Sequence, residues 1–273
     1  MLSRHNAKKI SIDRKKTKSP EDMPQMHAHE NHEIYFLLSG ARRYFIKDTI
    51  YDVSANDIIV IPKNELHRTV TYNESGYDRY VVYFPDMLTD AVRISAGNDN
   101  FENFLGCGCI QLSRPHAEKF KELLGEMEYE SGLSDRYTPL MLSNKLNELI
   151  VYAMRYGSPK EISPDKNAER IQTVAHFVTE NFASPITLHD AARMAYLEEA
   201  YFCKQFKKLT GFGFVEYLTQ VRVKAAASLL SDSDIPISKI AEKCGFTSGN
   251  YFGDVFKRFY GISPREYRKN TKM

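Results

Sequence analysis

The chain has 273 residues, of which 42% are hydrophobic and 26% are charged. This composition can support packed cores in two domains of ordinary size, and it excludes an intrinsically disordered chain. No run approaches the roughly 18 apolar residues that a membrane helix needs, so we expect a soluble cytoplasmic protein without a membrane partner. The four cysteines show neither zinc-site spacing nor a disulfide framework, which predicts reduced thiols.

Charge is distributed unevenly along the chain. Residues 1–19 contain seven Lys/Arg and one Asp, and residues 168–273 contain fifteen Lys/Arg against eleven Asp/Glu, whereas the segment between them is acidic. A basic C-terminal third favours a polyanionic partner for that third, although a solvated helical surface would explain the same modest excess. Residues 1–19 are interpreted as a solvated basic tail.

Short β-branched and aromatic runs occur from Glu33 to Val82, and they are separated by Gly, Asn, Asp and Pro. Their spacing is typical of an antiparallel barrel or sandwich, which we place in residues 20–112. In EIYFLLSG, residues 33–40, both alternating sets of side chains are apolar. This strand should therefore be covered on both faces, as in a β-barrel with a packed outer layer.

Residues 113–156 show the apolar period of two amphipathic helices. Their expected buried stripes are Phe120, Leu123, Leu124 and Met127 in the first, and Leu142, Leu146, Leu149, Ile150 and Ala153 in the second. Such a helical pair either covers the sheet or pairs with a second subunit, so it is the candidate dimerisation element. GSPKEISPDKN, residues 157–167, has two prolines and no apolar period, which predicts an interdomain linker.

Residues 168–270 contain the same short unit twice. YFCKQFKKLTGFGFVEYL (201–218) and YFGDVFKRFYGISPREYR (251–268) share aromatic, basic and glycine positions. Each copy reads as a short helix, a tight turn and a second helix. The second helix of the later copy is expected to bury Tyr251, Phe252, Val255, Phe256 and Phe259. A long helix over 214–230 should space the copies, with a stripe of Tyr217, Leu218, Val221, Ala225 and Leu229.

The outer faces of the two second helices are small, polar or basic. A helix-turn-helix places such a face in the major groove, where side chains read base edges and Lys or Arg contacts phosphates. The candidate DNA-binding residues are Ala200, Cys203, Lys204, Lys207, Gly249, Asn250, Gly253, Asp254, Lys257 and Arg258. A plain helical bundle is the alternative, but it does not explain a repeated turn with cationic outer positions.

The segment from PITLHDAARMAYLEEAYFCKQFKKLTG to FKRFYGISPREYR resembles the double helix-turn-helix domain of AraC-type transcription regulators. The resemblance implies that one polypeptide places two recognition helices in successive major grooves, roughly 34 Å apart. This chain departs from the family pattern at two positions. Tyr196 stands where the family usually has Gly, so the first turn must accommodate a side chain. Asp254 could accept from cytosine but would repel phosphate.

HAHENHEIYFLLSG, residues 27–40, contains His27, His29 and Glu33, and His67 follows a later strand-like run. On one strand, His27, His29 and Glu33 would share a face. The pattern resembles the metal motif of cupin barrels, which implies imidazole and carboxylate ligands for a divalent metal. AraC-type sensor domains often carry a similar pattern and bind an organic effector, so effector binding and metal binding both stay open. No cofactor is certain.

The sequence thus predicts a two-domain α+β chain: an N-terminal cupin-like, jelly-roll-like β-barrel with a helical pair, then an all-α double helix-turn-helix. We expect a transcription regulator that responds to a small-molecule effector and binds double-stranded promoter DNA as a homodimer, with RNA polymerase as a further partner of an activator. A carbohydrate is one candidate effector. The alternative is a metal-dependent cupin enzyme with an attached helical domain. No nucleophile–base arrangement stands out, so we expect no enzyme and assign no catalytic residue.

Overall fold

A computed structural model of the chain describes residues 9–19, 29–71, 76–161 and 165–271. These residues form two compact units. Residues 165–271 and the turn 47–50 make up one unit, and the remaining described residues make up the other. Among the described residues, no helix is long and apolar enough to cross a membrane. The β-rich and the all-helical unit confirm the predicted α+β organisation.

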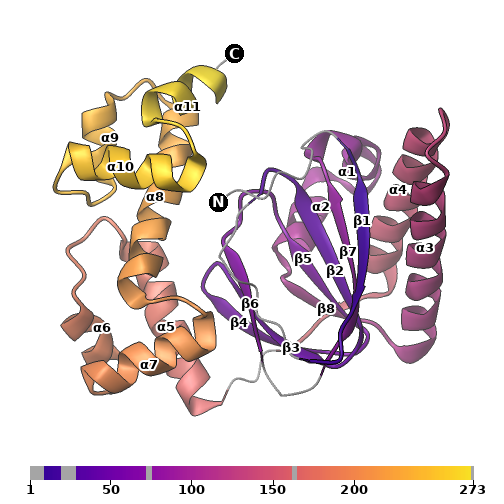
Figure 1. The fold of residues 1–273 in the computed structure, drawn as a ribbon, viewed down its shortest axis with the longest axis horizontal. Helices are drawn as coiled ribbons and strands as arrows, with labels where there is room; N and C mark the ends of the chain where they lie inside the picture. The colour runs from indigo at the N-terminus through magenta and orange to yellow at the C-terminus, as the bar shows by residue number, and fades with distance from the viewer. Residues whose placement is uncertain (1–8, 20–28, 72–75, 162–164, 272–273) are drawn as a thin grey trace. The chain divides into compact units, whose positions relative to one another are not determined.

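The strands of the N-terminal unit form two sheets (Figure 1). In spatial order, the larger sheet contains β1 (Ser11–Lys16), β7 (Asp78–Phe84), β2 (His32–Ser39), β5 (Asp57–Ile61), β8 (Cys109–Gln111) and β9 (Ser158–Pro159). The smaller sheet contains β4 (Thr49–Ser54), β3 (Ala41–Ile46) and β6 (His67–Thr71). The expected closed barrel is therefore corrected to two sheets, because β3 and β6 pair with each other and not with the larger sheet.

A tight turn at Gly40 carries the chain from β2 in the larger sheet to β3 in the smaller one. Gly40 has a φ of +95°, and a Cβ atom there would lie 2.6 Å from the carbonyl oxygen of Gly76. Only glycine fits this turn without strain. On β2, Tyr35 and Leu37 join the buried cluster between the sheets, whereas Ile34 and Phe36 join the cluster on the opposite face. The predicted two-sided burial of this strand is confirmed.

Helices cover the outer face of the larger sheet. They are the 3-10 turn η1 (Asp86–Leu88), α1 (Asp90–Ala96), α2 (Asn98–Gly106), α3 (Arg114–Leu133) and α4 (Thr138–Tyr156). All nine residues of the two predicted stripes in α3 and α4 are buried. Phe120 of α3 meets Phe36 of β2 with ring centroids 5.1 Å apart. Of the two roles expected for this helical pair, the structure therefore shows that it covers the sheet.

Both segments that were expected to be irregular contain folded parts. Within the expected basic tail, Ser11–Lys16 forms β1 and pairs with β7 along its whole length. Within the expected linker, Ser158–Pro159 pairs with β8, and the Lys160 ammonium lies 2.5 Å from the carboxylate of the buried Asp57. The periodic signal of such short edge strands is too weak to separate them from coil.

Residues 165–271 of the C-terminal unit form helices joined by short connections. The unit contains α5 (Lys166–Asn181), α6 (Leu188–Met194), α7 (Glu199–Thr210), α8 (Phe214–Asp232), α9 (Ile237–Lys243), α10 (Gly249–Tyr260) and α11 (Pro264–Thr271). The long helix α8 runs between the two helix-turn-helix copies, α6–α7 and α9–α10 (Figure 1). Its expected stripe is correct at Tyr217 and Leu218, but Val221, Ala225 and Leu229 are only partly buried. The reason is that α8 turns a second face, with Val223 and Ala227, toward the later copy.

Candidate functional site: two recognition helices and an inner histidine cluster

Each candidate recognition helix, α7 and α10, begins at a side-chain cap and ends at a left-handed glycine. The carboxylate of Glu198 accepts the backbone N–H of Tyr201 at 3.1 Å, and the hydroxyl of Ser248 accepts that of Tyr251 at 3.3 Å. Gly211 and Gly261 end the helices with φ values of 81° and 76°. Capping oxygens and C-terminal glycines are the usual helix boundaries, and here they delimit two helices of the same 12-residue length.

The turns before these helices differ as the sequence indicated. Tyr196 adopts a left-handed φ of 56° and is 84% exposed, whereas Gly245 occupies the equivalent place with a φ of 78°. The hydrogen bonds match: Leu197 N–H donates to the Ala192 carbonyl and Phe246 N–H donates to the Ala241 carbonyl, both at 3.0 Å. The first turn is therefore made with a side chain present.

The predicted DNA-binding residues lie on the outer faces of α7 and α10. Eight of them are exposed: Ala200, Lys204, Lys207, Gly249, Asn250, Asp254, Lys257 and Arg258. Cys203 and Gly253 are half-buried. The opposite faces are closed by Phe202 and Phe206 in α7 and by Phe252, Val255 and Phe256 in α10. Each helix thus separates a buried aromatic face from an accessible polar stripe.

Phe259 is only partly buried, which corrects one core prediction. Tyr251 corrects a second, because it is 51% exposed. Its counterpart Tyr201 is also exposed. Both follow a residue of the outer stripe directly in the sequence, so each side chain is rotated by about 100° from that stripe. Lys208 and Arg258 follow seven residues later, or about two turns, on the same flank and are exposed. The sequence analysis did not include Tyr201, Tyr251 or Lys208 among the candidate DNA-binding residues. The repeated Tyr-Phe pair was an available signal, because the core buries only the phenylalanine of each pair.

Two glycines on α10 have no packing role in the fold. A Cβ atom added at Gly249 or Gly253 would meet no atom within 4 Å. A glycine inside a helix costs about 1 kcal/mol relative to alanine. The narrow outer face of α10 therefore lowers the stability of the helix relative to one with alanine at these positions.

Three buried side chains meet on the inner side of the N-terminal unit: His29, Glu33 and His67. The Nε2 atom of His29 lies 3.0 Å from a Glu33 carboxylate oxygen, and that of His67 lies 3.6 Å from the same atom. The potential ligand atoms of all three lie within 4.8 Å of one another. The structure thus brings together three of the four predicted residues, and His27 lies outside the described residues.

The histidine rings are oriented by backbone carbonyls. The Nδ1 atom of His29 lies 2.6 Å from the Asn31 carbonyl oxygen, and that of His67 lies 2.9 Å from the Glu65 carbonyl oxygen. Nδ1–H donation to these carbonyls directs both Nε2 atoms toward Glu33. Burial opposes protonation of His29, but the hydrogen bond and charge of Glu33 raise its pKa above the usual value. Because β2 begins at His32, His29 reaches Glu33 from the segment before the strand.

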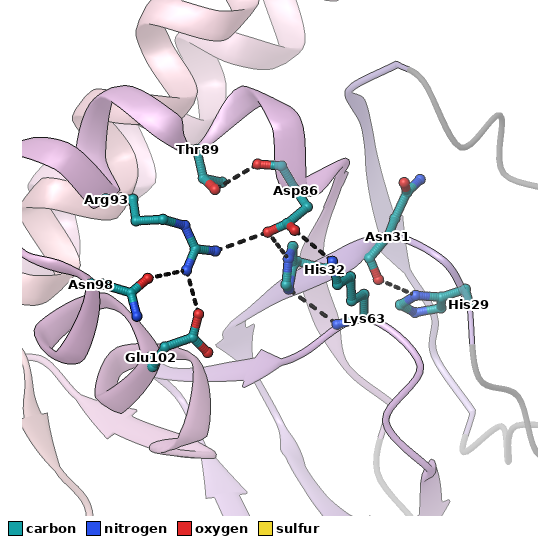
Figure 2. Close-up of polar contacts among 9 residues, drawn as sticks. All are labelled: His29, Asn31, His32, Lys63, Asp86, Thr89, Arg93, Asn98 and Glu102. Atoms are coloured by element: carbon teal, nitrogen blue, oxygen red, sulfur yellow. Dashed lines mark hydrogen bonds and ion pairs between the residues drawn. The ribbon is translucent and has the colours of Figure 1, made fainter. Parts of the chain in front are cut away.

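His32 points to the opposite face and joins a polar network with the helical layer (Figure 2). Its Nδ1 accepts the Lys63 backbone N–H at 3.1 Å, and its Nε2 donates to Asp86 at 3.1 Å. Burial opposes ionisation of Asp86, yet hydrogen bonds from Lys63 and His32 lower its pKa to about 2. Arg93 also contacts this carboxylate, at 3.0 Å. His32 is thus structural, and it holds the turn between β5 and β6, whose Asn64 N–H also donates to the His29 carbonyl at 2.8 Å.

The four cysteines are free thiols, as expected. Burial raises the pKa of Cys109 to about 12 and that of Cys244 to about 11. Such thiols remain protonated at neutral pH, so neither is a reactive nucleophile.

The two units match two family models. Residues 11–150 match the AraC-like ligand binding domain, and residues 191–270 match a helix-turn-helix domain. A ligand-binding domain joined to a DNA-binding domain defines a transcription regulator. The chain belongs to the AraC-type transcription regulators, with an N-terminal ligand-binding domain and a C-terminal helix-turn-helix DNA-binding domain.

Known proteins align along nearly the whole chain. The HTH-type transcriptional activator RhaR of Escherichia coli strain K12 is 24% identical over 250 residues, which cover 91% of this chain and 88% of RhaR. RhaR of Shigella boydii serotype 4 aligns with the same identity and coverage. Among solved structures, ToxT from Vibrio cholerae is 14% identical over 96% of this chain and 98% of its own, with a TM-score of 0.38. The DNA-binding domain of AdpA in complex with a target DNA is 31% identical over 39% of this chain and 93% of its own, with a TM-score of 0.36.

Proposed function

We propose that this regulator acts in the cytoplasm, contacts promoter DNA through the outer faces of α7 and α10, and changes its DNA affinity when a small molecule binds between its two sheets. The observation that carries this proposal is the repeated outer stripe, which is accessible in both copies and placed on equally capped helices. An accessible, slim helix face with cations at its margins suits insertion into a major groove.

We assign base contacts to the centre of each helix's outer face and phosphate contacts to its margins. We assign base contacts to Ala200, Cys203, Lys204, Gly249, Asn250, Gly253 and Asp254, because they form the central stripes. Phosphate contacts are assigned to Lys207, Lys257 and Arg258, and we add Tyr201, Tyr251 and Lys208 from the flank. Hydroxyl and cationic donors on a helix flank face the sugar–phosphate walls of the groove. The open surroundings of Gly249 and Gly253 also support a close approach of DNA to α10.

The effector is assigned to the inner side of the sheets at His29, Glu33 and His67. Their donor and acceptor atoms converge within hydrogen-bonding range of one small molecule. A carbohydrate suits such a set, because imidazole and carboxylate groups bind hydroxyls. Regulation would be a population shift, in which the ligand binds one conformation better and so changes the affinity for DNA.

The same three side chains fit a divalent metal as a second candidate. Two imidazole nitrogens and one carboxylate are a suitable donor set, and both Nδ1 atoms are held by carbonyls as metal-binding histidines usually are. A bound ion would supply a Lewis acid at this position. Metal analysis of the purified wild type and of His29→Ala distinguishes the candidates: stoichiometric metal lost in the variant supports the ion. We propose no catalysis; turnover that depends on His29, without DNA binding, would support the enzyme alternative instead.

The helical pair is the proposed homodimer surface. Large apolar side chains are exposed around the end of α3 and the beginning of α4, namely Tyr129, Leu133, Tyr137, Leu140 and Met141. Such a patch is unusual on a monomer. Leu140→Glu should convert a dimer to a monomer in sedimentation analysis, and a wild type that sediments as a monomer at micromolar concentration would contradict this assignment. If the regulator is an activator, as the name of RhaR states for that protein, RNA polymerase is a further partner.

DNA binding is the decisive test. Sites selected from random duplex DNA by the purified chain should be bound with an affinity that falls steeply as salt rises. Asn250→Ala should weaken binding to the selected site about tenfold with unchanged folding. Lys121→Ala, which removes an exposed charge from α3, is the control and should bind normally. Salt-independent binding, or no selected site, would rule out the proposed interface.

A further inference from the structure

Arg42 places a cation on the inner side of the N-terminal unit. Side chains alternate along β3, so Arg42 shares a face with Tyr44 and Ile46, which both belong to the buried cluster between the sheets. Arg42 is 5% exposed. Its guanidinium lies over the ring of Tyr77, 4.5 Å from the centroid. A charged side chain is thus enclosed among aromatic and aliphatic neighbours.

Within the described residues, Arg42 lacks the acceptor that comparable arginines have. Its neighbour Arg43, on the opposite face of β3, forms a bidentate pair with Asp52 at 2.5 and 2.8 Å. Arg79, on the inner face of β7, pairs with Asp13 at 2.6 Å. Among the residues that the structure describes, none accepts a hydrogen bond from Arg42 or forms an ion pair with it. A cation–π contact replaces only part of the hydration that burial removes.

Tyr35 supplies a second buried donor on the same inner side. It is 3% exposed, and its hydroxyl has no hydrogen-bond partner within the described part of the chain. Its ring meets that of Tyr44 edge-on, with centroids 5.0 Å apart, and Tyr44 lies two residues after Arg42. Burial raises the pKa of Tyr35, and the nearby charge of Arg42 opposes that rise. Buried donors without acceptors are costly, so this pair is suited to receive an anionic oxygen group.

We propose that the effector is a hydroxylated carboxylic acid, such as a sugar acid, whose carboxylate pairs with Arg42 and accepts a hydrogen bond from Tyr35. This inference rests on the proposed effector role of the inner side. The planar guanidinium matches both oxygens of a carboxylate. A phosphate dianion fits less well, because Glu33 shares the inner face of β2 with Tyr35, two residues away. His29, Glu33 and His67 then remain for the hydroxyl groups.

Thermal unfolding of the purified full chain tests this proposal. The probes are sodium glucuronate, its neutral methyl ester, glucose and sodium phosphate, each compared with sodium chloride at one ionic strength. Glucuronate should raise the Tm of the wild type by about 2 °C or more above the chloride reference, and neither neutral sugar should match it. Arg42→Met should abolish this rise. In chloride alone Arg42→Met should melt above the wild type, because it replaces a buried cation for which the described part of the chain provides no acceptor.

Arg43→Met is the matched control, because it removes the adjacent guanidinium from the opposite face. It should melt below the wild type, since Asp52 loses its partner, and it should keep the response to glucuronate. The proposal is overturned if glucuronate acts no better than chloride, if phosphate acts better, or if the response survives Arg42→Met. Failure of the wild type to bind DNA both with and without glucuronate would instead overturn the regulatory proposal, and it would not affect the conclusion from the glucuronate measurements.

Discussion

In the first helix-turn-helix copy the turn is made by Tyr196 and the outer stripe carries Lys204, whereas in the second copy Gly245 makes the turn and Asp254 lies in the stripe. The buried aromatic residues and the C-terminal glycines are the same in kind in both copies. Packing requires the same kinds of residue on the buried face of each copy. The residues of the outer face do not pack in the core, so they can differ according to the DNA that each copy contacts. The two copies should therefore have equal folding roles and unequal DNA-binding roles.

The largest expected effect is on the second turn. A Cβ atom at Gly245 would lie 2.8 Å from the Ala183 carbonyl oxygen, in a backbone conformation with a φ of +78°. Gly245→Val should therefore lower the free energy of unfolding by about 3 kcal/mol, from strain and crowding together. Gly261→Ala is the control, because its φ is also positive but a Cβ atom there meets nothing within 4 Å. Urea denaturation measures the free energy of unfolding of both variants. Equal decreases would show that crowding at the Cβ atom of residue 245 does not contribute.

The charges of the two stripes should act in opposite directions on DNA affinity. Lys207→Ala should weaken binding to non-cognate duplex about fivefold near 0.15 M salt, because one phosphate contact releases about one counterion. Asp254→Asn should strengthen the same binding by a similar factor, because a carboxylate that repels phosphate is removed. Fluorescence anisotropy across a salt series measures both effects. If both variants shift affinity in the same direction, α7 and α10 do not both face the DNA.

Gly253 separates stability from binding within the second copy. Gly253→Ala should raise the free energy of unfolding by about 1 kcal/mol, because alanine favours the helix and its Cβ atom has open surroundings. The same methyl group should weaken specific DNA binding, because it would stand between α10 and the groove. Calorimetry and anisotropy on one preparation test both parts. A variant that is more stable and binds DNA normally would show that α10 makes no close approach at this residue.

The smallest effect concerns the first turn. Tyr196→Gly should raise the free energy of unfolding by about 0.5 kcal/mol, since relief of the left-handed strain exceeds the conformational freedom that glycine loses on folding. Little packing is lost because the ring is exposed. A clear decrease in stability would show that the ring of Tyr196 contributes packing that its exposure does not indicate.

Predictions from the sequence succeeded where burial follows a regular period. The stripes of α3 and α4 and three of the five expected buried positions in α10 were predictable, because one amphipathic helix against one surface repeats every 3.6 residues. The stripe of α8 was only half right, because that helix packs on two surfaces in turn. Tyr251 was misplaced because local spacing cannot show that Phe252 and Phe256 already fill the core beside it.

At the inner site, the residue types were enough to predict that His29 and Glu33 would meet, although His29 lies before β2 and not on it, and the sequence also pointed to His67. By itself the sequence determined the two-domain organisation, the duplicated helix-turn-helix and the residues of its outer stripes, because these depend on local periods and spacing. Only the tertiary structure decided that the strands form two sheets and that Arg42 is buried without an acceptor among the described residues. Both depend on which distant strands face one another, and that choice is made by packing across the whole unit.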